Sequence, residues 1–405
     1  MTPTFSSAVS APIGVSEPVS PARLKNAVAR RFLDACSRID TGRLTVITPD
    51  GQRQSFGSGD EVELHIRDWG AVTALAARGD IGLGEAYIEG LWDCPDIAAL
   101  TRLAFNNEAA LGGHLHGSFL NRLSFLFADR LMRRNSKRGS ARNIKAHYDV
   151  GNEFYSLWLD ESMTYSSALF ASYDESLEQA QARKYQRLLD ATAGGEGRTL
   201  EIGCGWGGFA EAAANQGQDV TAVTISPSQH AFATERLQGR ADIRLCDYRD
   251  IQGKYDSIVS VEMIEAVGER YWPTYFRKIK DSLADDGRAA LQAIIVNDDL
   301  FRDYRGRSDF IRRYTFPGGM LLAPEQIASA ASRAGLKSEN LFRFGPDYAE
   351  TLRRWLVSFE DAAPAIKRLG YSEKFLRSWR FYLAICIGAF DVGRTDVVHV
   401  ELAHA

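Results

Sequence analysis

The sequence predicts an α/β fold in which a doubly wound, Rossmann-like sheet follows a small α+β N-terminal domain. From about residue 197, short apolar runs rich in β-branched residues alternate with helical patterns. This alternation is typical of a parallel sheet covered on both faces. The stretch LEIGCGWGGF, residues 200–209, also has the G-x-G-x-x-G spacing of a strand that turns tightly into a helix. A ligand is therefore expected at the carboxyl ends of the strands, beside Gly203.

Length and composition limit the classes of protein to consider. The 405 residues suffice for about two or three domains, and 45% hydrophobic with 25% charged residues is ordinary for a globular protein. A net charge of −4 argues against a nucleic-acid partner. The five cysteines are scattered and form no C-x-x-C, so we expect no disulfide framework, no metal site and a cytoplasmic location. No apolar run reaches the roughly 20 residues that span a bilayer.

The N-terminal third is predicted to contain a disordered tail and one small domain. Residues 1–20 are rich in Pro, Ser and Ala and lack the features of a signal peptide. The domain, residues 21–128, begins with a helix over about 22–39. A hairpin over 43–56 turns at Pro49-Asp50-Gly51, and residues 62–69 alternate like a further strand. Short helices follow, and no catalytic constellation is evident in this domain.

A basic linker is predicted over residues 129–145. Its basic residues are Arg130, Arg133, Arg134, Lys137, Arg138, Arg142 and Lys145. One interpretation is a solvated connector. The other is a contact with anionic lipid headgroups, to which each basic residue near the surface contributes about 1 kcal/mol.

The last domain, residues 146–405, supplies the predicted doubly wound sheet. Its expected strands lie at 198–203, 219–225, 242–247, 256–261 and 288–296, with helices at 206–216 and 226–237 among the segments between them. The apolar stretch FYLAICIGAF, residues 381–390, is predicted to be a buried helix rather than a membrane span.

Two cofactors fit a glycine-rich loop of this kind. NAD domains usually place an acid at the end of the second strand for the ribose hydroxyl, but residues 222–229 contain none. Glu201, just before the first glycine, suits the cationic S-adenosylmethionine, because it can order the loop and balance the charge. Asp247, at the end of the third strand, is placed to receive an adenine amino group. The alternative is that both acids are surface residues at strand ends.

Further stretches resemble the cyclopropane fatty acid synthases, which include the mycolic acid methyltransferases. They are AHYDVGNEFYSLWLDESMTYSSALF (146–170), LEIGCGWGGF, VTISPSQ, CDYRDI, SVEMIEAVG and RYTFPGGMLL, in this order. The resemblance is close from about residue 143, and GDIGLGEAYIEGLWD (79–93) also looks like the longer bacterial members. It implies a class I methyltransferase sheet with a helical cover, S-adenosylmethionine as donor, and unsaturated acyl chains of membrane phospholipids as acceptors. The enzyme would be cytoplasmic and associate peripherally with the membrane. The oligomeric state stays open, a homodimer included.

The resemblance also implies a donor site, carried over position by position. Tyr165 and Ser166 would hold the methionine moiety, and Gly203 and Gly205 would let the backbone approach the donor. Ribose and adenine would be bound by Thr224, Ile225, Gln229, Asp247 and Tyr248. His147, Tyr148 and Asp149 would belong to a helical cover over the pocket, or would simply lie on an exposed loop.

The expected reaction begins with attack of an alkene on the sulfonium methyl group, which leaves a carbocation in the chain. The protein must hold the reacting atoms about 3–3.5 Å apart and exclude water. Aromatic faces stabilise a cation by about 0.5–2 kcal/mol. The candidates for this role, with core packing as the alternative, are Phe154, Tyr155, Tyr314 and Phe316.

Ring closure needs a base, and the resemblance implies a bound bicarbonate for this role. The matching pocket positions are Ser167, Glu265, Gln292, Ile294 and Tyr348. Ser167 stands where the family has Cys, a mild change if the backbone N–H binds the anion. Gln292 replaces His, and an amide cannot carry the positive charge that favours an anion. Glu265 is the alternative base, and Glu262 is interpreted as a structural carboxylate.

The predicted function is transfer of a methyl(ene) group from S-adenosylmethionine to unsaturated acyl chains of phospholipids, with a cyclopropane product favoured. Within the same class, the alternatives are methyl- or methylene-branched chains, or furan precursors. An NAD-dependent oxidoreductase is disfavoured by residues 222–229. A lipid-binding protein without activity would need a broken donor site, and this one is intact in sequence.

Overall fold

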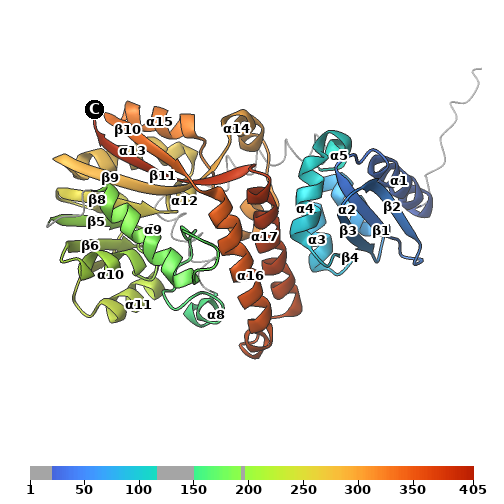
Figure 1. Ribbon diagram of the computed structural model, residues 1–405, viewed down its shortest axis with the longest axis horizontal. Coiled ribbons are helices and arrows are strands. Elements are labelled where there is room, and N and C mark those ends of the chain that lie inside the picture. Colours follow the sequence, from blue (N-terminus) through green and yellow to red (C-terminus); the bar gives the residue numbers. More distant parts are fainter. Residues whose placement is uncertain (1–20, 116–149, 193–196) are drawn as a thin grey trace, which may run out of the picture.

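Two β-sheets lie on either side of a pair of long helices in the computed structural model, which describes residues 21–115, 150–192 and 197–405 (Figure 1). The N-terminal part consists of α1 (Pro21–Cys36), β1 (Gly42–Ile47), β2 (Arg53–Ser58), β3 (Glu61–Ile66), α2 (Gly70–Arg78), α3 (Asp80–Ile88), β4 (Trp92–Asp93), α4 (Ile97–Asn106) and α5 (Glu108–Leu115). The predicted tail, the basic linker, residues 116–128, and His147, Tyr148 and Asp149 lie outside the described residues.

The remainder of the chain forms the larger sheet and its helices. The first half comprises α8 (Asn152–Ser156), α9 (Leu177–Ala191), β5 (Arg198–Ile202), α10 (Gly208–Asn215), β6 (Asp219–Thr224), α11 (Pro227–Leu237), β7 (Asp242–Leu245), η1 (Tyr248–Asp250), β8 (Tyr255–Val261), α12 (Ile264–Val267) and η2 (Glu269–Tyr271). The second half comprises α13 (Trp272–Ser282), β9 (Leu283–Val296), α14 (Asp298–Arg305), η3 (Ile311–Thr315), α15 (Pro324–Arg333), β10 (Leu336–Arg343), α16 (Gly345–Arg368), α17 (Glu373–Asp391) and β11 (Thr395–His404).

The small sheet has the strand order β2-β1-β3-β4. The hairpin of β1 and β2 pairs Gly42 with Ser58 and Ile47 with Arg53, which confirms the predicted turn. Strand β3 runs parallel to β1 on its other side, so the chain crosses over after the hairpin. The small sheet and helices α1 to α4 share one apolar core with α16 and α17.

The large sheet has the order β10-β11-β9-β8-β5-β6-β7. Strands β5 to β9 run parallel, as the alternation of strands and helices predicts. Two further strands, β10 and β11, extend the edge beyond β9 in antiparallel pairing. The strand order reverses between β5 and β8, and a crevice at the carboxyl ends of these strands is the usual ligand site of such a fold.

Alternate residues of the parallel strands face two different cores. Val259 and Ala290 pack with α9, α10 and α11. Their neighbours Ile258 and Ala289 pack with α13 and α15. Because successive side chains of a strand point to opposite faces, helices cover the sheet on both sides. This arrangement confirms the predicted fold class.

Helix α17 joins the N-terminal part to the large sheet. It contains the apolar stretch 381–390, which is largely buried in the shared core, and it packs along α4 and α16. A Cβ added at Gly388 would lie 2.5 Å from Thr101 Cβ, so the glycine lets α17 approach α4 closely. Arg377 donates to Tyr87 O at 2.6 Å and Asp93 Oδ1 at 2.7 Å, and Arg102 donates to Asp391 at 2.7 Å.

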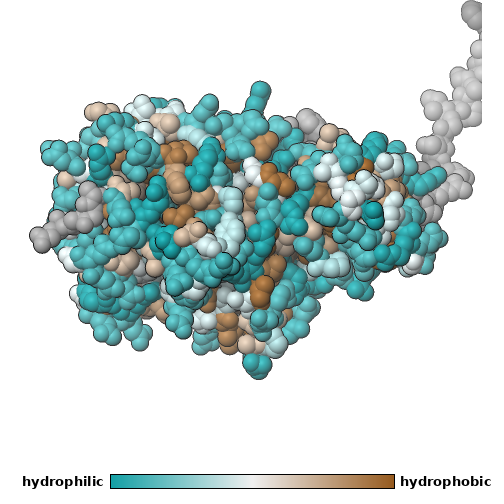
Figure 2. All heavy atoms as spheres, in the orientation of Figure 1, coloured by the Kyte–Doolittle hydropathy of each residue, from teal (hydrophilic) through white to brown (hydrophobic). Residues whose placement is uncertain are grey.

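Figure 2 shows how hydrophobic residues are distributed over one face of the molecule. The face shown is mostly hydrophilic, and its hydrophobic residues form separate patches rather than one belt. Among the described residues, no helix combines the length and apolar character needed to cross a bilayer.

Candidate active site

The glycine-rich loop follows β5 and leads into α10. Gly203, Gly205 and Gly207 all have positive φ angles, of 85°, 52° and 85°, which side-chain-bearing residues rarely adopt. A Cβ at Gly203 would lie 2.7 Å from Met263 Cγ. A Cβ at Gly205 would meet no atom within 4 Å, because this glycine borders a cavity. The loop therefore exposes backbone to a ligand at the position that the sequence predicts.

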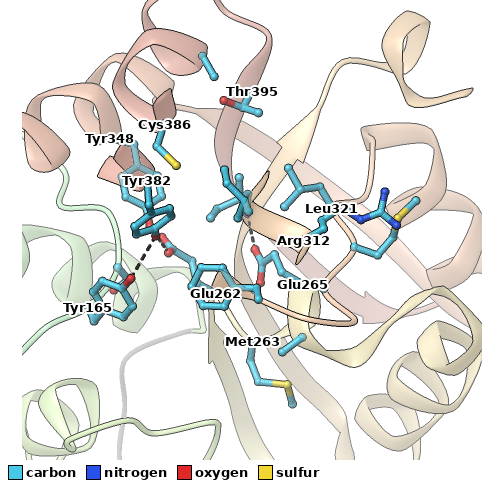
Figure 3. Close-up of a pocket in the computed structure, with 18 of the residues that line it drawn as sticks. Tyr165, Glu262, Met263, Glu265, Arg312, Leu321, Tyr348, Tyr382, Cys386 and Thr395 are labelled. Atoms are coloured by element: carbon cyan, nitrogen blue, oxygen red, sulfur yellow. Dashed lines mark hydrogen bonds between the residues drawn. The ribbon is translucent and has the colours of Figure 1, made fainter. Parts of the chain in front are cut away.

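A cavity of about 620 Å³ extends from this loop into the shared apolar core, and Figure 3 shows part of its lining. Of the predicted site residues, all but Ser167 and Gln292 line it. Those on the wall are Tyr165, Ser166, Glu201, Gly203, Gly205, Thr224, Ile225, Gln229, Asp247, Tyr248, Glu265, Ile294 and Tyr348. The folded chain thus gathers residues from seven separate stretches of sequence around one space.

At the end of β6, where NAD domains have an acidic residue, this chain has Thr224 and a polar loop. The Thr224 hydroxyl donates to Gln229 Oε1 at 2.9 Å, and Ser226 caps α11 by accepting from the Gln229 N–H. These bonds hold the Gln229 amide at the cavity wall. At the end of β7, Asp247 forms an ion pair with Arg249 at 2.5 Å and caps η1. Asp247 is therefore held in place at the wall by a guanidinium group and a backbone N–H.

Helix α8 covers the donor side of the cavity. The Trp206 indole N–H donates to Asn152 Oδ1 at 2.9 Å, which ties the glycine-rich loop to the first turn of this helix. Phe154 and Tyr155 are fully buried in the aromatic core behind it. They belong to the cover, but neither lines the cavity, so the structure does not support their predicted contact with a carbocation.

Glu201 is a buried carboxyl group at the donor loop. Its exposed fraction is 2%, and among the described residues its Oε2 has no hydrogen-bond partner. Burial raises the pKa of Glu201 to about 8, and the Ala210 N–H and Lys184 oppose this shift. An unsatisfied buried acid is costly unless a ligand compensates it, and the sulfonium and ammonium groups of S-adenosylmethionine would do so.

Donor binding should therefore release a proton at neutral pH. The acid is protonated below about 8 in the free protein, and a nearby cation lowers its pKa. We expect donor affinity to rise as pH is raised toward about 8, and calorimetry in buffers of different ionisation enthalpy to detect the released proton. Glu201→Gln should abolish the release, whereas Glu235→Gln, on the exposed face of α11, should not. Equal proton release by both variants would contradict this role.

Lys184 is a buried cation that the sequence analysis did not identify. It lies on α9, is inaccessible to solvent, and donates to Ser166 Oγ at 2.6 Å. Burial lowers its pKa to about 7, while Glu262, Asp160 and Glu201 oppose that change. Its sequence signal is a Lys on the largely apolar side of a helix. Its charge balances the buried acids around the cavity.

Glu262 is the centre of a hydrogen-bond network at the cavity wall. The Ser167 N–H donates to its Oε1 at 2.8 Å, the Gln292 amide donates to the same oxygen at 2.7 Å, and the Tyr348 hydroxyl donates to Oε2 at 2.7 Å. Figure 3 shows Tyr165, Tyr348 and Tyr382 grouped around it. Glu262 is interpreted from the sequence as a structural carboxylate, but in the structure it lines the cavity.

Gln292 is held in one orientation by His399. The His399 Nε2 lies 2.8 Å from Gln292 Oε1, and burial lowers the pKa of His399 to about 3, so the neutral ring donates this bond. The Gln292 amide group then donates to Glu262 Oε1 and to Ser167 O, the latter at 3.2 Å. Ser167 and Gln292 thus lie behind Glu262, and they contact its carboxylate rather than the cavity.

Glu265 lies three residues further on and faces the same cavity. Its Oε1 accepts from the Ile294 N–H at 2.5 Å, and among the described residues its Oε2 has no partner. Burial, and then the charge of Glu262, raise the pKa of Glu265 to about 8. Glu265 is therefore largely protonated at neutral pH.

The apolar part of the cavity lies between the N-terminal helices and α17. Its walls include Leu83, Leu100, Ala104 and Phe105 from α3 and α4, and Phe381, Tyr382, Ile385, Ala389 and Phe390 from α17. The N-terminal domain shows no catalytic constellation in its sequence, and its contribution to the site was not predicted. Of the predicted aromatic candidates, only Phe316 lines the cavity. Tyr314 is 45% exposed, and its hydroxyl donates to Glu85.

Metal and disulfide chemistry find no support in the part of the chain that the structure describes. All five cysteines are described and free. Among the residues that the structure describes, no group of His, Cys, Asp or Glu side chains has the arrangement of a metal site.

Comparisons with known proteins agree with this geometry. A family model described as "Mycolic acid cyclopropane synthetase" matches residues 135–400. "Tuberculostearic acid methyltransferase UfaA1" of Mycobacterium tuberculosis (strain ATCC 25618 / H37Rv) is 38% identical over 344 residues, which cover 80% of each chain. "Cyclopropane-fatty-acyl-phospholipid synthase" of Escherichia coli (strain K12) is 38% identical over 317 residues, covering 77% of this chain and 80% of that one.

A solved structure of a related enzyme has a similar fold. The mycolic acid cyclopropane synthase CmaA1 "complexed with SAH and CTAB" has a TM-score of 0.61 at 26% identity, and the match covers 65% of this chain and 97% of that one. The fold, the glycine-rich loop and the cavity beside it define an S-adenosylmethionine-dependent methyltransferase. More narrowly, the chain belongs to the mycolic acid cyclopropane synthetase family. In this family the donor is S-adenosylmethionine and the acceptors are unsaturated fatty acyl chains.

Proposed function

We propose that the protein transfers a methyl group from S-adenosylmethionine to the double bond of unsaturated acyl chains in membrane phospholipids and closes a cyclopropane ring. The observation that carries this proposal is a single cavity with three regions. One part borders the glycine-rich loop, another is apolar, and the buried carboxyl groups of Glu262 and Glu265 lie on its wall. Such a space holds a cationic donor and an alkyl chain together away from water.

The residues of the chain have distinct tasks in this reaction. The glycine-rich loop and Gln229 orient the donor, and Glu201 balances its charge. The apolar walls from α4 and α17 hold the acyl chain and exclude water, which would capture the carbocation. Phe316, Tyr165 and Tyr382 present aromatic rings to the cavity, and such rings stabilise a nearby cation by about 0.5–2 kcal/mol.

A second product class is favoured by one comparison. The relative UfaA1, at the same 38% identity as the bacterial cyclopropane synthase, is named a tuberculostearic acid methyltransferase. Methyl transfer to the alkene is common to both routes, and they diverge only in which proton the carbocation loses. A methyl- or methylene-branched chain is therefore the alternative product.

The proposal is tested by the lipids of cells that express the protein. We expect unsaturated phospholipid acyl chains to gain the mass of one methylene group, in proportion to the amount of protein. Cells that express Gly205→Val, whose donor loop is obstructed, supply the control and should show no gain. Unchanged lipids in cells that contain folded wild-type protein would contradict the proposed function.

We propose that the protein is cytoplasmic and binds the membrane surface through the basic linker, residues 129–145. Its attraction to anionic lipid is electrostatic, so vesicle binding should weaken as salt rises, because the screening length is only about 10 Å at 0.1 M ionic strength. Neutralising Arg133, Arg134, Lys137 and Arg138 together should weaken sedimentation with anionic vesicles and leave donor affinity unchanged. Binding that does not depend on salt would point to apolar insertion instead.

A further inference from the structure

The carboxylate of Glu262 occupies an anion-binding pocket of the protein. Three groups donate hydrogen bonds to it: the Ser167 N–H, the Gln292 amide and the Tyr348 hydroxyl, at 2.7–2.8 Å. These groups belong to three of the five positions at which the family resemblance implies a bicarbonate ligand. The side chain of Glu262 thus lies where the resemblance would place an exogenous anion.

The backbone of Glu262 is strained in order to reach this position. Its φ of 47° is left-handed, a conformation that residues with a side chain rarely adopt. Such strain persists only where the surroundings fix the conformation, and it is concentrated at functional sites. Here Glu262 N donates to Gln292 O at 2.8 Å, and three donors hold the carboxylate.

Bicarbonate does not fit this arrangement. The donors at Ser167, Gln292 and Tyr348 are directed to Glu262, and the Ile294 N–H is directed to Glu265 at 2.5 Å. A second anion would lie against the Glu262 carboxylate without a donor of its own, and like charges in a buried site repel strongly. No step of the reaction is therefore assigned to bicarbonate in this chain.

Of the two neighbouring carboxyl groups, Glu262 is the one that carries the negative charge. It accepts three hydrogen bonds, whereas Glu265 accepts one, from Ile294. The buried Lys184 ammonium group also attracts the charge of Glu262. A carboxylate has about four lone-pair sites, so one site of Glu262 remains, on Oε2 beside the Tyr348 hydroxyl.

Glu262 also lies where the reaction needs a base. It faces the cavity beside Tyr165, which the resemblance places on the donor side and whose hydroxyl lies 3.1 Å from that of Tyr382 on the apolar side. Figure 3 shows the carboxyl groups of Glu262, which follows β8, and of Glu265, in α12, in this space. The donor methyl group and the alkene must meet between these two sides for transfer to occur.

We propose that Glu262 is the proton acceptor of the reaction and replaces bicarbonate in this protein. The inference rests on the proposed function. The alkene π pair forms a bond to the donor methyl carbon while the C–S bond breaks, which releases S-adenosylhomocysteine and leaves a carbocation. Glu262 Oε2 then takes a proton from the transferred methyl group, and the C–H electron pair closes the ring onto the cationic carbon. The proton leaves Glu262 for solvent when the product departs.

The test compares wild type, Glu262→Gln and Glu262→Gly in buffer free of carbon dioxide. The glutamine keeps the shape without the base, and the glycine relieves the left-handed backbone and opens room for an anion. Release of S-adenosylhomocysteine and formation of cyclopropane lipid are measured with vesicles of dioleoyl phosphatidylglycerol. Titration of ¹³C-bicarbonate followed by NMR measures anion binding without turnover, and donor affinity by calorimetry verifies folding.

Wild type should turn over at full rate without bicarbonate and bind none of the labelled anion. Glu262→Gln should lose about 10²–10⁴-fold in cyclopropane formation, the usual contribution of a general base. Glu262→Gly should lose a similar factor, bind ¹³C-bicarbonate and regain activity when bicarbonate or formate is added. A wild-type requirement for bicarbonate, or a fully active Glu262→Gln variant, would overturn the inference. If wild type transfers no methyl group under any condition, the proposed function fails, and bicarbonate binding to wild type still decides whether Glu262 fills the anion pocket.

Discussion

Gly205→Val is expected to weaken S-adenosylmethionine binding by about 100-fold or more, which corresponds to roughly 3 kcal/mol. The glycine borders the cavity, and a Cβ there would enter open space that the donor must occupy. Its φ of 52° adds strain for a β-branched residue. Calorimetric titration of the donor measures the loss directly.

Gly217→Val is the matched control for this experiment. Gly217 also has a positive φ, of 82°, with no atom within 4 Å of an added Cβ, but it lies in the turn after α10 and away from the cavity. Both variants carry backbone strain, whereas only Gly205→Val obstructs the donor. Equal donor affinity in the two variants would show that the glycine-rich loop does not bind the donor.

Ala104→Trp should reduce turnover of long unsaturated acyl chains by about 100-fold, the scale of loss that follows from displacing a reacting group by 1 Å. Ala104 lies on α4 and lines the apolar part of the cavity, so an indole there would fill space intended for the chain. Donor affinity should not change, because the glycine-rich loop is untouched. Release of S-adenosylhomocysteine from vesicle assays gives the rate.

Ala109→Trp provides the comparison, because Ala109 is an exposed residue of α5. It should leave turnover unchanged. If Ala104→Trp is as active as this control, the acyl chain does not enter between α4 and α17. The N-terminal part would then have no role in holding the substrate.

The parallel part of the large sheet could be predicted because its signals are local. Apolar strands and helices alternate with a regular period, and the glycine spacing marks the turn after β5. The antiparallel strands β10 and β11 lie outside that alternation, and α16 and α17 separate them along the chain. Strand β11 pairs with β9 and β10 pairs with β11, and no pattern within either segment specifies these tertiary contacts.

The positions of the site residues could be predicted from the sequence better than their roles could. The resemblance placed Ser167, Gln292 and Tyr348 near one another, and all three contact a single group in the structure. That this group is Glu262 could not be read from the sequence, because it depends on one left-handed residue. The position of Ala104 on the cavity wall could not be predicted either, because it depends on the packing of α4 against α17, which is distant in the sequence.

The central claim is methyl transfer followed by ring closure, and S-adenosylmethionine labelled as trideuteromethyl tests it most directly. Purified protein is incubated with this donor and dioleoyl phospholipid vesicles, and the acyl products are analysed by mass spectrometry and NMR. Ring closure removes one deuteron from the transferred group, so we expect products that retain two deuterons and show ring protons far upfield of alkene protons. A product that retains all three deuterons, or one with alkene signals and no ring protons, would contradict ring closure.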